Sequence, residues 1–135
     1  MGTWSHEPFG NDDAADWAYE LEGAKDLSPV EAALDAVLEN DGYVDASEAA
    51  CAVAAVEVIA KLLGRGTRSD AYTEKVERWV EQLRVVPSRA LLTKAQHALE
   101  RIVGEQSELR ELWHEGDADE WEASLGALRA IVGAH

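Results

Sequence analysis

The stretch from Ala49 to Leu63 constrains the fold more than any other part of this 135-residue chain. Its only polar residues are Glu57 and Lys61, so a helix formed by this stretch is apolar on almost every side. Such a helix must be surrounded by other helices, and its many alanines allow those neighbours to approach closely. The sequence therefore predicts an all-α fold, a single compact bundle of about six or seven helices around a central alanine-rich helix at about residues 45–63.

Helix-start signals separate the other predicted helices. Ser28 opens a capping box with Pro29 at the first helical position and Glu31 three residues on. Asn11 is positioned to cap an earlier helix. Further helices are predicted at about residues 70–84, 88–103, 107–114 and 117–132. We expect residues 1–10 to be an irregular segment packed on the bundle, and residues 1–135 to form one domain, because a chain of this length is too short for two independent cores.

Glu57 is a carboxylate at the midpoint of the predicted central helix. It lies one turn before Lys61, and an exposed pair at this spacing is worth only a few tenths of a kcal/mol. A buried Glu57 must be hydrogen-bonded or protonated. We expect a structural role, in which Glu57 accepts backbone or indole N–H groups from another segment. The alternative is that Glu57 belongs to a polar site.

The charge of the chain is strongly one-sided. The net charge is −15, from 27 acids and 12 bases. Residues 1–48 contain 13 of the acids and a single base, Lys25. This negative field repels nucleic acid and anionic membranes, and it accelerates encounter with a basic protein at low salt. A basic protein partner is therefore predicted, with no nucleic acid and no membrane; the simpler alternative is that the charge only maintains solubility.

Other features of the sequence limit the possible cellular location and oligomeric state. The longest apolar run, residues 49–56, is far shorter than the roughly 20 residues of a membrane span, and the N-terminus has no basic-then-apolar signal pattern. We therefore expect a cytoplasmic protein. The single cysteine, Cys51, lies in an alanine and valine run and is expected to be a buried, inert thiol. The C-terminal helices carry enough apolar surface for a homodimer, so monomer and homodimer both stay open.

The N-terminal segment carries a dense pattern of aromatic and polar residues. Its positions are Trp4, Phe9, Asn11, Asp12, Ala14, Asp16 and Trp17. They resemble the N-terminal signature of the bacterial domain-of-unknown-function family numbered 4259. The stretches 49–60 and 107–113 also look like that family, and Ser5 and Glu7 depart from the glycine-rich pattern expected there. The resemblance implies a helical fold with no established activity, so no catalytic residues are carried over.

The same motif has a physical interpretation as an anchor. Trp4 and Phe9 are large apolar side chains, each able to bury well over about 100 Å², and they can fix the terminus onto the helices. Asn11 and Asp12 fit the start of a helix, where a side-chain oxygen accepts a free backbone N–H. Asp16 has no evident structural duty in this scheme.

Chemical sites have weaker support. His6, Glu7, Asp12, Asp13 and Asp16 supply enough oxygen and nitrogen atoms for a divalent cation, but no HExxH spacing is present. Residues 37–48 resemble a calcium-binding EF-hand loop at several positions, although Val37 stands where a carboxylate ligand is required. No GxSxG or glycine-rich phosphate loop occurs, and His97 and His114 have no nearby signature. No catalytic residue, metal site or cofactor is predicted.

Two functions therefore stay open. The first is a non-enzymatic binding or regulatory module, immunity-like in character, that docks a basic or amphipathic protein. The second is a metal-dependent, hydrolase-like enzyme that uses Glu57 with Asp12, Asp16 or His6. The candidate binding residues are Trp4, His6, Asn11, Asp12, Asp16, Trp17 and Glu57.

Overall fold

The computed structural model describes residues 17, 19–21, 23–24, 26–39, 42–63, 74–83, 86–104, 107–108, 110–111 and 118–133. Of these, residues 74–77, 118–121 and 124 are described by their backbone alone. Within this part of the chain the structure gives the bounds of five helices. They are α2 (Ser28–Leu38), α3 (Ala46–Leu62), α4 (Glu74–Leu83), α5 (Arg89–Ile102) and α7 (Ala118–Gly133).

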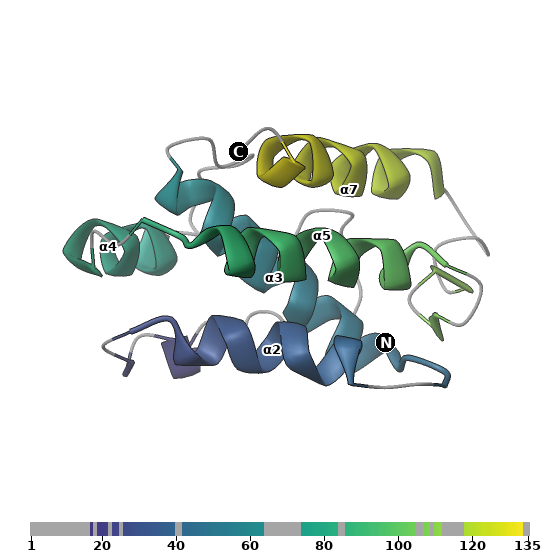
Figure 1. The fold of residues 1–135 in the computed structure, drawn as a ribbon, viewed down its shortest axis with the longest axis horizontal. Coiled ribbons are helices and arrows are strands. Elements are labelled where there is room, and N and C mark those ends of the chain that lie inside the picture. The colour runs from purple at the N-terminus through teal and green to yellow at the C-terminus, as the bar shows by residue number, and fades with distance from the viewer. Residues whose placement is uncertain are drawn as a thin grey trace.

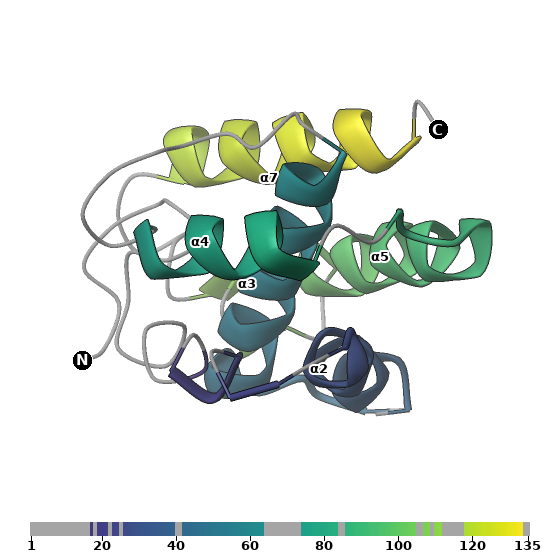
Figure 2. The ribbon, with the colours of Figure 1, turned by 90° about the vertical axis from the view of Figure 1, so that its left-hand side faces the viewer.

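Helix α3 is the central element of a compact all-α bundle. It contacts α2, α4, α5 and α7, and Figures 1 and 2 show it crossing between α2 on one side and α7 on the other, with α4 and α5 flanking it. Every residue from Ala52 to Ala60 is buried. The prediction of an all-α bundle around an alanine-rich central helix is confirmed, and its physical cause is the absence of any polar face on this helix.

The core is built from the apolar stripes of the surrounding helices. Helix α2 buries Val30, Ala33, Leu34 and Val37 against the bundle, as its periodicity predicts. Helix α5 buries six residues at helical spacing, and Leu125, Leu128 and Val132 do the same on α7. Trp17 and Leu21, from the helical residues that precede α2, close the core at one end. No strand occurs in the described residues, where Val44 and Ser107 form an isolated bridge.

Two of the three described helix starts have a capping side chain. The carboxylate of Asp45 accepts the Glu48 N–H at 2.8 Å, and the hydroxyl of Ser88 accepts the Leu91 N–H at 3.1 Å. The predicted capping box at Ser28 is wrong, since Ser28 is already helical and the capping residue, Leu27, makes no side-chain cap bond. Asp26, two residues upstream, accepts the Ser28 N–H at 3.0 Å instead. This backbone hydrogen bond lowers the pKa of the Asp26 carboxyl below its ordinary value.

The predicted helices at about residues 70–84 and 117–132 correspond to α4 and α7 within the described ranges. Residues 108, 110 and 111 of the predicted helix at 107–114 are helical. The anchoring of residues 1–10, and the capping roles of Asn11 and Asp12, lie outside the described residues. No helix in the part of the chain that the structure describes has the length and apolarity needed to span a membrane.

Candidate functional site

The bundle carries a groove of about 320 Å³ between the residues before α2, one face of α2 and the first two turns of α3. Its walls are mainly apolar and are formed by Trp17, Pro29, Ala32, Ala33, Ala36 and Cys51. The polar lining residues are Glu20, Ser47 and Glu48. Both charged side chains among the described lining residues are therefore acidic. Cys51, expected to be buried, is half-buried because it lies on the side of α3 that lines this groove.

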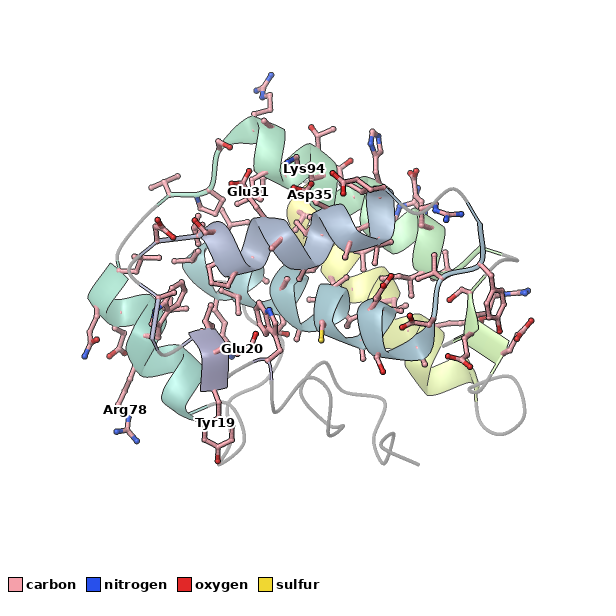
Figure 3. The ribbon with its side chains drawn as sticks, turned by 90° about the horizontal axis from the view of Figure 1, so that it is seen from below. Tyr19, Glu20, Glu31, Asp35, Arg78 and Lys94 are labelled. Atoms are coloured by element: carbon pink, nitrogen blue, oxygen red, sulfur yellow. The ribbon has the colours of Figure 1, made fainter. Side chains whose placement is uncertain are left out.

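Two acids of α2 that do not line the groove, Glu31 and Asp35, lie next to α5. Glu31 and Asp35 are met by Lys94 of α5, with N–O distances of 3.6 and 3.0 Å, and Figure 3 shows the three side chains converging where α2 lies next to α5. The hydrogen bond to Asp35, followed by the charges of Asp35 and Glu31, raises the pKa of Lys94. Lys94 thus neutralises part of the acidic surface of α2 and attaches α2 to α5.

Glu57 lies in the centre of α3 and is completely buried. Its carboxylate lies 3.8 Å from the ammonium of Lys61, whose side chain is 6% exposed. Among the described residues, no buried side-chain nitrogen or oxygen lacks a hydrogen-bond partner. Glu57 is nine residues beyond Glu48, about 13 Å along the helix axis, and does not line the groove. A buried, satisfied carboxylate at this place supports a structural role.

The start of α3 is joined to a distant segment of the chain. The Glu108 N–H donates to the Val44 carbonyl at 2.9 Å, and the Ala46 N–H donates to the Glu108 carboxylate at 2.7 Å. The Tyr43 hydroxyl donates to the Glu111 carboxylate. These contacts join residues 43–46 to residues 107–111 and fix the first turn of α3, which carries Glu48 into the groove wall. Sequence periodicity gives no sign of this pairing.

Two further contacts account for polar residues in the segment 37–48 that resembles an EF-hand loop. The carboxylate of Asp45 caps α3, and the Gly42 carbonyl accepts a hydrogen bond from Arg101 at 2.9 Å. In the described residues, no group of three or more His, Cys, Asp or Glu side chains could hold a metal ion. Asp41 lies outside that part of the chain. The calcium hypothesis and the hydrolase-like alternative therefore gain no supporting observation.

Comparison with known proteins places the chain in a family. A model of the domain of unknown function DUF4259 matches residues 2–124. This chain belongs to the DUF4259 family. The resemblance read from the sequence is confirmed at the level of the family, and the matched range includes the positions of the N-terminal motif. No curated protein and no solved structure matches the chain.

The structure of this DUF4259 protein places two of the seven candidate binding residues. Trp17 is buried at the groove, and Glu57 is buried in the middle of α3. Trp4, His6, Asn11, Asp12 and Asp16 lie outside the described residues. Glu20 and Glu48 were missed as site residues, because in the sequence Glu20 is an ordinary acid of the first predicted helix and Glu48 an ordinary acid in the first turn of the central helix.

Tyr43 is expected to titrate far above an ordinary tyrosine. Its hydrogen bond to Glu111, together with the nearby carboxylates, raises the pKa of Tyr43 from 10.0 to about 12. Because the folded pKa is raised, the stabilisation from this bond is present below about pH 10 and is lost as the pH rises through 12. In the folded protein, absorbance at alkaline pH should show one tyrosine with this pKa. The Y43F variant should lack that component, and E111Q should shift it toward 10; ordinary titration of every tyrosine in the wild-type protein would contradict the assignment.

Proposed function

We propose that this DUF4259 protein is a non-enzymatic binding module that docks a basic protein through its acidic N-terminal third. The observation that carries the proposal is the one-sided charge: Lys25 is the only Lys or Arg in the first 60 residues. In the described part of that region, Glu20 is exposed before α2, Glu31 is exposed on α2, and Glu39 is exposed at the residue that follows α2. Asp12 and Asp16 of the N-terminal motif add to the same negative field.

Electrostatics would then control the encounter between the two proteins. A surface of one sign concentrates a partner of the opposite sign and raises the association rate by about 10-fold to 1,000-fold at low salt. The effect is screened over about 8 Å at physiological ionic strength. Lys94 offsets only part of the charge on α2, so a cationic surface can still approach Glu20 and Glu39. The partner should therefore be a basic protein, bound in a salt-sensitive complex.

The test is native mass spectrometry of the protein captured from its own cell extract at low salt, repeated at high salt and after chelation. A basic protein should be present at low salt and absent at high salt. The association rate of the two purified proteins should fall by about tenfold or more as salt is added. A complex insensitive to salt would overturn the proposal, and loss of a metal ion on chelation would favour the enzyme alternative.

Matched variants make the test specific to the acidic region. The triple variant D35N/E39Q/D41N removes three charges from that region, whereas E100Q/E105Q/E122Q removes three from the C-terminal half. The first should slow association several-fold more than the second, because attraction between charges falls with distance and screening. Equal slowing by both would show that net charge alone acts and that the acidic third has no special role.

A further inference from the structure

We infer that the groove between Trp17 and Glu20, α2 and the start of α3 is the docking surface, and that its occupant is the apolar face of a basic amphipathic helix. The inference rests on the proposed function and adds to it the place of contact and the form of the partner. Both are read from the lining of the groove, which combines apolar walls with acidic side chains.

The walls of the groove fit a helix better than a small polar ligand. The exposed Ala32 and Ala36, with the buried Ala33 beneath them, supply one wall, and their small side chains leave a hollow on α2. Trp17 and Pro29 extend the apolar surface. A small-molecule site normally encloses most of its ligand's surface, whereas this hollow is open to solvent along the exposed residues Ala32 and Ala36. An amphipathic helix needs such an open apolar groove for side chains spaced at i, i+3, i+4 and i+7.

The charges beside these walls indicate the sign of the charge that the partner must carry. Glu20 comes from the residues before α2, and Glu48 comes from the first turn of α3. Among the lining residues that the structure describes there is no Lys or Arg. A helix whose apolar face fills the groove would place Lys or Arg side chains, which flank that face, near these two carboxylates. An acidic or neutral helix would leave both carboxylates partly desolvated and without a cation.

The first experiment uses two synthetic peptides and the full chain. One is an 18-residue peptide with leucines on one helical face and lysines on the other, and the second has the same composition scrambled so that the apolar face is lost. The amphipathic peptide should bind about tenfold more tightly than the scrambled one, because only its apolar face matches the groove. Equal binding of both peptides would overturn the groove inference while leaving the acidic docking module in place. Failure of both to bind at low salt would remove the proposed function as well.

Two double variants with the same charge locate the contact. E20Q/E48Q alters the groove, and E100Q/E122Q alters exposed acids on α5 and α7. The first should weaken binding of the amphipathic peptide by about tenfold and the second by less than about twofold. A36W places a large side chain at an exposed position in the groove wall and should abolish binding with helicity unchanged. Equal weakening by both double variants, or full binding by A36W, would contradict the inference.

Cys51 provides an internal reporter, because it is the only cysteine of the chain and it lines the groove. Iodoacetamide should alkylate Cys51 in the free protein, and saturating amphipathic peptide should slow that alkylation several-fold. The scrambled peptide at the same concentration should not slow it. A thiol that does not react in the free native protein would show that the groove is already covered, and it would overturn the inference.

Discussion

Replacing Glu57 by leucine is expected to lower the free energy of unfolding by about 3–5 kcal/mol. Glu57 is fully buried, and its carboxylate lies 3.8 Å from the ammonium of Lys61, which is itself almost completely buried. The single substitution leaves this ammonium without its anion in the interior, and the desolvation cost of the remaining charge is then uncompensated. Urea denaturation followed by circular dichroism measures the loss.

The double variant E57L/K61M tests whether E57L is destabilising because Lys61 loses its anion or because this position of α3 requires a polar side chain. Methionine has nearly the volume of lysine and leucine is only about one methylene group larger than glutamate, and apolar replacement of a whole buried ion pair is often neutral or stabilising. The double variant should therefore recover most of the stability lost by E57L, so that the effects of E57L and K61M are strongly non-additive. A double variant as unstable as E57L would contradict this account and would assign the stabilisation to the other partners of Glu57.

The same double variant tests whether Glu57 has a direct role in binding. Glu57 is separated from Glu48 by nine residues of α3 and does not line the groove. A folded E57L/K61M protein should therefore bind the amphipathic peptide as the wild-type protein does. Loss of binding with stability retained would return Glu57 to the list of site residues and would favour the polar-site alternative.

The central helix could be predicted because the residues that indicate it are adjacent in the sequence. Fifteen successive residues from Ala49 to Leu63 with only Glu57 and Lys61 polar leave no face suited to water, whatever the order of the other helices. The caps at Asp45 and Ser88 are local in the same sense. Ser28 failed as a cap because the helix starts one residue earlier, and the Glu31 N–H that the Ser28 hydroxyl would accept donates to the Leu27 carbonyl at 3.0 Å. The residue at which the first turn begins depends on backbone geometry, which residue spacing does not determine.

The contacts that hold the start of α3 could not be predicted, because the two segments that they join are far apart in the sequence. Ala46 and Glu108 are joined across 62 residues, and Tyr43 and Glu111 across 68. Helical periodicity states which residues share a face but not which distant segment lies beside it. Residues 37–48 illustrate the consequence, since an aspartate that caps α3 has the same place in the sequence as a calcium ligand. The contacts between residues 43–46 and residues 107–111 could not be predicted for the same reason.

Alanine shows the limit of sequence interpretation most directly. Ala54 of α3 is fully buried, whereas Ala36 lines an open groove and Ala130 is exposed on α7. The residue type is the same at all three positions. The segment that packs against each alanine decides whether its small side chain permits close packing or leaves a hollow. The role of an alanine can therefore be measured by enlarging it in place.

Ala54→Leu should lower the free energy of unfolding by about 1–3 kcal/mol, because extra methyl and methylene groups in a packed core force neighbouring helices apart. Ala130→Leu, at an exposed position of α7, should change it by less than about 0.5 kcal/mol. Leucine and alanine are both strong helix formers, so the difference between the variants isolates packing from helix propensity. Urea denaturation of both proteins provides the comparison. An Ala54→Leu protein as stable as Ala130→Leu would mean that the helices around α3 are not closely packed, and the alanine-rich sequence of α3 would then need a reason other than close approach.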